Sequence, residues 1–137
     1  MTIYEVIHEL HQTVRYVTKK ANERLKPHGL YQSQWAILYS LKRFGPMTQT
    51  DLWRYLNVEA PTVTRTLSRL EEKGWVIRKQ GTDKRERIVY LTEKAIEKLP
   101  AVEESIRTHE EEMLMALSDE EQEQLLTLLK RVRRITQ

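Results

Sequence analysis

Residues 48–92 decide the fold, and their sequence is TQTDLWRYLNVEAPTVTRTLSRLEEKGWVIRKQGTDKRERIVYLT. Within this stretch, Val63, Leu67 and Leu70 recur at the i, i+4, i+7 spacing of one helix face, which predicts a helix over Pro61–Lys73. The opposite face holds arginines and short hydroxyl side chains. A helix with one apolar stripe and such an outer face suits the major groove of a DNA duplex.

A second helix is predicted just before this one. Thr48 and Asp51 form a capping-box pattern that marks its start, and Asn57 is suited to a left-handed stop at its end. Only residues 58–60 then separate the two helices. This is the spacing of a helix-turn-helix.

A β-hairpin is predicted directly after the second helix. Trp75–Gln80 and Arg87–Leu91 are rich in β-branched and aromatic residues, and residues 81–86 join them in a hairpin with a charged tip. A hairpin in this position is a wing, so the stretch as a whole predicts a winged helix-turn-helix.

Helices are also predicted on both sides of this unit. Apolar residues at helical spacing predict a helix over Ile3–Leu25 and a short core helix over Gln32–Phe44. Thr92 is expected to cap a long helix that continues to about Leu117, with a kink at Pro100. Ser118 opens a last helix, whose apolar stripe is Leu125, Leu126, Leu128, Leu129, Val132 and Ile135.

The composition is that of a protein with one domain and helical extensions. The chain has 137 residues, 39% of them hydrophobic and 31% charged, and it contains no cysteine. Disulfides, thiolate metal sites and thiol redox sensing are therefore excluded. No apolar run approaches the ~20 residues that a bilayer requires, and the first residues do not resemble an export signal. The sequence predicts a cytoplasmic protein without a membrane partner.

Positive charge is concentrated where DNA contact is expected. Residues 45–92 carry nine basic and six acidic side chains, whereas residues 93–137 carry seven basic and eleven acidic ones. This distribution is expected if one face of the molecule meets phosphate and the remainder avoids it.

The terminal helices predict a homodimer. A winged helix-turn-helix closes its own small core, so the apolar stripes of the first and last helices require another surface, which a second copy supplies. The alternative is a monomer in which these helices pack on each other. We call the helix predicted over Pro61–Lys73 the groove helix. In a dimer, its two copies, ~34 Å apart, would contact a palindromic operator in double-stranded DNA.

The sequence resembles the MarR family of winged-helix transcriptional regulators over nearly its whole length. The resemblance is carried by Val63-Thr64-Arg65, by residues 70–76 (LEEKGWV), and by Asp83-Lys84-Arg85 followed by residues 89–92 (VYLT). It implies a mainly α fold with a small β-hairpin wing, and three parts: an N-terminal dimerisation helix (1–30), a DNA-binding winged helix-turn-helix (31–92) and C-terminal dimerisation helices (93–137). It also implies that Arg85 approaches the minor groove, that Asp83 shapes the wing loop, and that a small-molecule effector binds between the dimer helices and the DNA-binding part.

The candidate DNA contacts lie on the groove helix and on the wing. On the helix, Arg65 is expected to contact a base and the hydroxyl side chains to set the register. The full set is Pro61, Thr62, Thr64, Arg65, Ser68 and Arg69 on the helix, with Asp83, Lys84, Arg85 and Arg87 on the wing. The alternative for the charged members is an ordinary solvated surface.

Three aromatic residues, Tyr16, Trp35 and Tyr39, are candidates for a pocket that binds a small aromatic effector, although any of them can instead belong to the core. His8 and His11 share a helix face and suggest a metal site with Glu5 or His109, but no spacing fixes a third ligand, so no metal is predicted.

Enzyme signatures are missing from the sequence. It has no glycine-rich phosphate loop, nucleophile elbow or dense cluster of histidines and carboxylates, so neither catalysis nor a cofactor is expected. The predicted function is a DNA-binding transcriptional regulator, a repressor released by an effector. The alternatives are a winged-helix module that binds protein rather than DNA, and a metal-responsive regulator.

Overall fold

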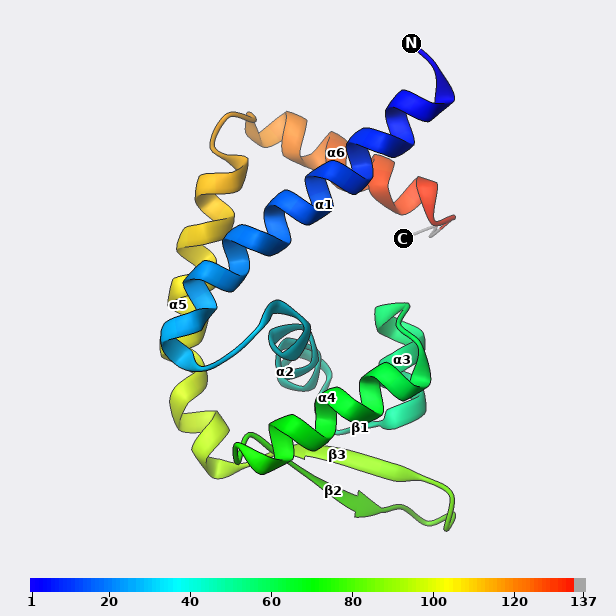
Figure 1. The fold of residues 1–137 in the computed structure, drawn as a ribbon, viewed down its shortest axis with the longest axis vertical. Coiled ribbons are helices and arrows are strands. Elements are labelled where there is room, and N and C mark those ends of the chain that lie inside the picture. The colour runs from blue at the N-terminus through cyan, green and yellow to red at the C-terminus, as the bar shows by residue number, and fades with distance from the viewer. Residues whose placement is uncertain (135–137) are drawn as a thin grey trace.

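The computed structural model describes residues 1–134; Ile135, the last position of the predicted apolar stripe, lies outside them. Figure 1 shows the arrangement of the elements. In chain order they are α1 (Ile3–Leu25), η1 (Lys26–His28), α2 (Gln32–Phe44), β1 (Met47–Thr48), α3 (Gln49–Leu56), α4 (Ala60–Glu72), β2 (Val76–Gln80), β3 (Arg87–Leu91), α5 (Glu93–Leu114) and α6 (Asp119–Val132).

The sheet has three antiparallel strands in the order β1-β3-β2. The hairpin is confirmed, with Val76 opposite Leu91 and Gln80 opposite Arg87. The first strand was not predicted, because two residues are too few to show a β period. In it, Thr48 pairs with Ile88 and also caps α3, since its Oγ1 accepts a hydrogen bond from the Asp51 N–H at 3.0 Å.

The helix-turn-helix has the predicted form. Asn57 ends α3 in the left-handed region at φ 55°. The groove helix α4 begins at Ala60, one residue before the predicted start, and ends at Glu72. Glu59 occupies the N-cap position without a side-chain cap. The first turn of α4 tolerates Pro61, because an N–H at that position would have no intrahelical partner.

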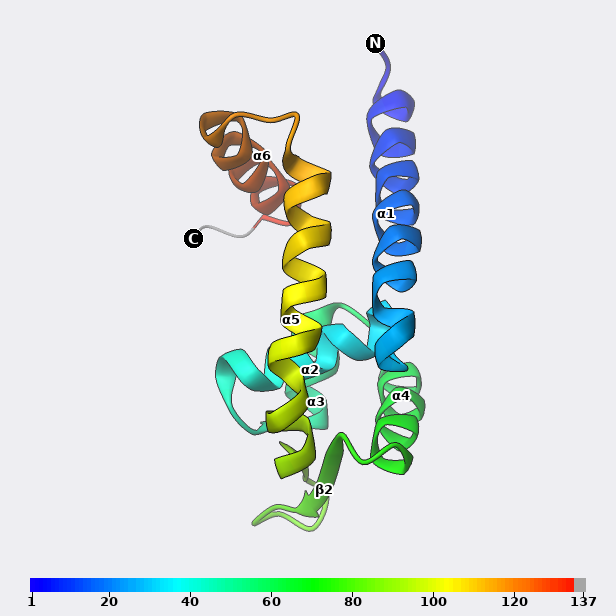
Figure 2. The ribbon, with the colours of Figure 1, turned by 90° about the vertical axis from the view of Figure 1, so that its left-hand side faces the viewer.

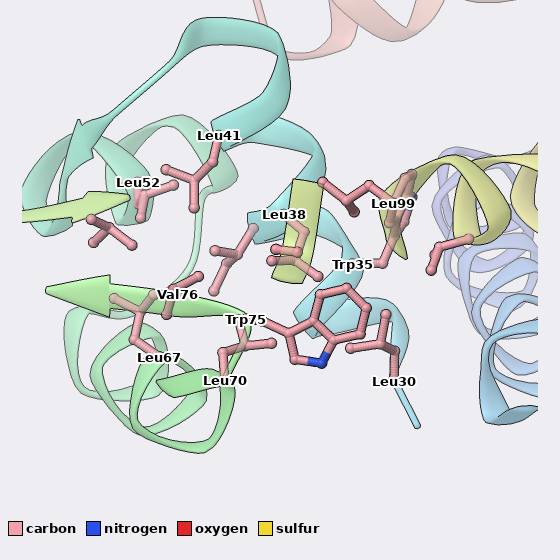
Figure 3. Close-up of a cluster of buried hydrophobic side chains, with 14 of the residues drawn as sticks. Leu30, Trp35, Leu38, Leu41, Leu52, Leu67, Leu70, Trp75, Val76 and Leu99 are labelled. Carbon is pink, nitrogen blue, oxygen red and sulfur yellow. The ribbon is translucent and has the colours of Figure 1, made fainter. Parts of the chain in front are cut away.

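One hydrophobic core joins α1, α2, α3, α4, the β2–β3 hairpin and α5 (Figure 3). Leu38 of α2, Leu52 of α3, Leu67 of α4 and Val89 of β3 are fully buried in it. Leu25 of α1 and residues of α5 belong to the same core, so the predicted parts 1–30, 31–92 and 93–137 share it.

The long helices α1 and α5 run side by side in opposite directions (Figures 1 and 2). Arg24 of α1 pairs with Glu112 of α5 at 2.5 Å, and His28 Nε2 lies 2.9 Å from Ser105 Oγ. The helix α5 ends at Leu114, earlier than predicted. Pro100, where a kink is expected, lies inside the helix without ending it.

The last helix, α6, extends from the top of α5, and Figure 2 shows it well apart from α1. Its predicted start is confirmed, because Ser118 and Glu121 form a complete capping box. None of its residues is buried. Its apolar stripe is therefore open in the single chain.

Among residues 1–134, no helix combines the length and the apolar character that crossing a bilayer requires.

Candidate nucleic-acid interface

The outer face of α4 presents the side chains that the sequence singles out. Val63, Leu67 and Leu70 bury the inner face, which turns the helix so that the polar residues point away from the core. Of the six candidates, the exposed ones are Pro61, Thr64, Arg65 and Arg69, and the half-buried ones are Thr62 and Ser68.

The hydroxyl groups on this face are held by the helix itself. Thr64 Oγ1 donates to the Ala60 carbonyl at 3.1 Å, and Ser68 Oγ donates to the Thr64 carbonyl at the same distance. Arg65 Nη2 donates to Thr62 Oγ1 at 3.3 Å, which leaves most of its guanidinium donors free. The face thus combines a fixed row of small hydroxyl groups with the long, multi-donor side chains of Arg65 and Arg69.

A network that we call the Arg78 brace joins this helix to the wing. It consists of Arg78 on β2, Ser68 and Glu71 on α4, and Gln49 on α3. The Arg78 guanidinium donates to Ser68 Oγ at 3.1 Å, to Glu71 Oε1 at 3.0 Å and to Gln49 Oε1 at 3.4 Å. The Arg78 backbone N–H donates to Glu71 Oε2 at 3.2 Å. The brace fixes α4 relative to both the wing and α3.

The hydrogen bond from Arg78 and its positive charge hold the pKa of Glu71 below its ordinary value, against a smaller opposing effect of burial. The sequence prediction missed this network. One signal was available: Arg78 is two residues after the buried Val76, so it occupies a position on the inward face of the strand.

The tip of the wing is shaped by Asp83. Its Oδ1 accepts a hydrogen bond from the Arg85 N–H at 3.0 Å, and its carbonyl accepts one from the Glu86 N–H at 2.9 Å. The side chains of Lys84 and Arg85 are exposed at this tip, as is Arg87 at the start of β3. The three basic wing candidates therefore form one exposed basic edge.

The aromatic candidates divide between two places. Trp35 and Tyr39 lie together, with ring centroids 5.9 Å apart, in a cleft of about 230 Å³ between α1, α2, α3 and α5. Burial raises the pKa of Glu110, which also lines this cleft, while the charge of His109 opposes that effect. Tyr16 is 54% exposed on α1 and lies outside the cleft lining. The structure thus brings together two of the three predicted residues.

The histidines considered for a metal site are not brought together. His8 and His11 are exposed on α1, whereas His109 is 3% exposed on α5. In the part of the chain that the structure describes, no three His, Cys, Asp or Glu side chains gather in a way that could hold a metal ion.

Comparison with known proteins places this geometry among transcriptional regulators. The MarR family model matches residues 30–86. The uncharacterized HTH-type transcriptional regulator YwoH of Bacillus subtilis is 54% identical over 118 residues, which are 86% of each chain.

Two solved structures are similar along nearly their whole length. A mutant MarR from E. coli, complexed with operator DNA, is 28% identical, has a TM-score of 0.81 and is matched over 96% of this chain and 99% of its own. Overoxidized AbfR bound to DNA is 27% identical, has a TM-score of 0.79 and is matched over 96% and 93%. With its winged helix-turn-helix, its basic wing and a relative of this identity and coverage, the chain belongs to the MarR family of transcriptional regulators.

Proposed function

We propose that this protein is a homodimeric, sequence-specific DNA-binding repressor that occludes a promoter and is released by a small-molecule effector. The observation that carries the DNA-binding part is the outer face of α4, where exposed Arg65 stands beside Thr62 and Thr64 on a helix braced to a basic wing. DNA is the partner of the MarR and AbfR chains in the two similar structures.

The dimer is supported by the exposed apolar residues of α1 and α6. On α1, Val6, Val14 and Val17 are 49%, 55% and 37% exposed, and on α6 Leu126 and Val132 are 54% and 60% exposed. These two helices do not cover each other in the single chain, which argues against the monomer alternative. A second copy would cover both stripes and set two α4 helices ~34 Å apart.

The effector part is supported by the cleft at Trp35 and Tyr39. The cleft has aromatic walls and lies between the long helices and the DNA-binding elements. A ligand there releases DNA only if it binds more tightly to a dimer geometry that no longer matches the half-site spacing.

The test is fluorescence anisotropy on the protein's own upstream DNA. Arg65→Ala is expected to cost ~1–3 kcal/mol of binding free energy and to relax specificity at one base pair per half-site. Arg107→Ala, on the acidic helix α5, is the matched control and should leave binding unchanged. Unaltered affinity in Arg65→Ala would refute base contact by this residue.

Two further measurements separate the proposal from its alternatives. The logarithm of the DNA-binding constant should fall steeply and linearly with the logarithm of the salt concentration, because phosphate contacts release counterions. A winged-helix module for protein partners would show no such dependence. Deletion of the coding sequence should raise transcript levels from the bound promoter, whereas an activator would give the reverse.

A further inference from the structure

The C-terminal end of α4 is held by the start of α5. Lys94 Nζ donates to the Lys73 carbonyl at 3.1 Å. Thr92 Oγ1 donates to the Gly74 carbonyl at 2.6 Å, and its backbone N–H donates to the Trp75 carbonyl at 3.1 Å. We call these three contacts the α4–α5 clamp. Figure 1 shows the base of α5 beside this end of α4, so the clamp ties the groove helix to the long helix α5.

The backbone at the end of α4 leaves these carbonyls open to donors from another element. The Gly74 N–H donates to the Glu71 carbonyl at 3.0 Å. The Trp75 N–H donates to the Leu70 carbonyl at 2.9 Å. This pair of bonds is a Schellman motif, and it uses the left-handed φ of 84° that Gly74 adopts. The motif satisfies carbonyls inside the helix, whereas the carbonyls of residues 73–75 depend on donors from elsewhere.

The Lys94 side chain is the charged member of the clamp. It lies against the backbone of Gly74, where an added Cβ would stand 3.4 Å from Lys94 Nζ and 3.6 Å from its Cδ. In the described part of the chain, Lys94 forms no ion pair with a carboxylate. Its ammonium lies instead at the carbonyl end of α4, where the helix dipole places partial negative charge. The contact thus combines a directional hydrogen bond with a favourable charge.

We infer that Lys94 is a positioning residue for DNA binding, which fixes the tilt of α4 relative to α5 and thereby the half-site spacing that the protein accepts. The helix α5 leads to α6, whose open apolar stripe belongs to the proposed dimer. In that dimer, the distance between the two α4 helices depends on how each α4 sits on its own α5. This step of the inference rests on the proposed function.

The other attachments of α4 constrain it in a different way. Val63, Leu67 and Leu70 bury its inner face, and the Arg78 brace joins it to the wing and to α3. Apolar packing is non-directional and allows shifts of ~1–2 Å between helices. Two copies together can then move their outer faces by ~2–4 Å, which is comparable to the ~3.4 Å that one base pair adds to the spacing. A directional bond at the end of α4 limits such a shift.

The test measures how strictly the protein selects the spacing of its half-sites. Footprinting on the protein's own upstream DNA locates the operator, and duplexes are made with the native spacing and with one base pair added or removed. In fluorescence anisotropy, wild type should bind the altered duplexes roughly tenfold more weakly, whereas Lys94→Met should lose only about threefold. One base pair also rotates a half-site by about 35° about the duplex axis, so a loosened helix recovers part of the fit and not all of it.

Two variants serve as controls for charge and for rescue. Lys98→Met removes the same charge from an exposed position one turn later on α5 and should select spacing as wild type does. Lys94→Arg keeps a long cationic donor and should restore the selection that Lys94→Met loses. A duplex with a single half-site should bind wild type and Lys94→Met equally, because the inferred role concerns the distance between two helices.

Amide hydrogen exchange tests the clamp without DNA. In Lys94→Met, the Gly74 and Trp75 amides should exchange roughly three- to tenfold faster than in wild type, because the end of α4 opens more often. The fully buried positions Leu38 and Leu52 should keep their exchange rates, which shows that the variant is folded.

Four results would overturn the inference. They are equal spacing selection in wild type and Lys94→Met, the same loss of selection in Lys98→Met, failure of Lys94→Arg to restore it, and unchanged exchange at Gly74 and Trp75. A uniform loss of affinity at every spacing, with a shallower salt dependence, would instead make Lys94 a phosphate contact and would also refute the positioning role. If wild type binds no DNA or shows no preference for spacing, the proposed dimeric function fails, and hydrogen exchange still decides whether Lys94 holds the end of α4.

Discussion

Replacing Arg78 by methionine removes the guanidinium at the centre of the Arg78 brace and keeps a side chain of similar length. Arg78 is 17% exposed and Glu71 is 40% exposed, so their ion pair is partly screened and contributes roughly 0.5 kcal/mol. The hydrogen bonds to Ser68 and Gln49 add about 0.5–1 kcal/mol each, with the 3.4 Å bond to Gln49 at the weak end. The free energy of unfolding should fall by about 1.5–2 kcal/mol.

Urea denaturation followed by tryptophan fluorescence measures this change. Chain concentrations must be matched, because the stability of the proposed dimer would depend on concentration. A double-mutant cycle with Glu71→Gln isolates the ion pair and should give a coupling energy of roughly 0.5 kcal/mol. Glu72→Gln, on the neighbouring exposed position, is the control and should show no coupling to Arg78.

The brace also predicts a pH dependence. The pKa of Glu71 is lowered in the folded protein, so the folded state binds this proton less readily than the unfolded chain. The stabilisation by the pair is therefore complete above the ordinary pKa of a glutamate and is lost as the pH falls through the lowered folded value. The difference in unfolding free energy between wild type and Arg78→Met should decrease as the pH falls over that acidic range.

Two results would refute this reasoning. The first is an unfolding free energy of Arg78→Met within the error of wild type at neutral pH. The second is a coupling energy of zero with Glu71→Gln. Either would mean that the network is an incidental surface contact and does not hold α4 against the wing.

Three other changes probe the wing and the two helix ends. Lys84→Ala combined with Arg85→Ala should weaken DNA binding uniformly across operator variants and make its salt dependence shallower. Fluorescence anisotropy in a salt series measures both effects. A loss of affinity confined to one base pair would contradict a phosphate or minor-groove role. Asn57→Val should cost about 1–2 kcal/mol of stability, because a branched side chain is strained at φ 55°, whereas Asn57→Gly should be tolerated. Equal melting temperatures of the two variants would contradict this. Thr92→Val should lower the free energy of unfolding by about 1–2 kcal/mol in urea denaturation. Thr92 Oγ1 accepts a hydrogen bond from the Ala95 N–H at 3.1 Å and donates one to the Gly74 carbonyl at 2.6 Å, and valine makes neither. An unchanged midpoint would show that this cap is dispensable.

The helices could be predicted because each has both an apolar repeat at helical spacing and a capping residue that marks one of its ends. The stripe of Val63, Leu67 and Leu70 defines the buried face of α4, and Asn57 and Ser118 mark helix ends by their local chemistry. Such signals lie within a few residues of the element that they define. Predictions from them were therefore accurate to within three residues.

Features that depend on distant parts of the chain were not predictable in the same way. The strand at Met47–Thr48 exists because β3 offers it a partner some forty residues away. The Arg78 brace requires β2, α3 and α4 to be positioned first. Tyr16 was grouped with Trp35 and Tyr39 by residue type alone, and the rotation of α1 leaves it outside the cleft.

The separation of charge along the molecule affects how it meets a duplex. Residues 103–123 hold nine acidic side chains against the single basic Arg107, and they lie on the parts of α5 and α6 farthest from the wing (Figure 1). The phosphate field of DNA repels this end and attracts the basic wing, which exerts a torque on an approaching molecule before any contact forms. Fewer encounters then begin in a non-productive orientation, so the separation increases the association rate at low ionic strength, and salt that screens the field removes this advantage.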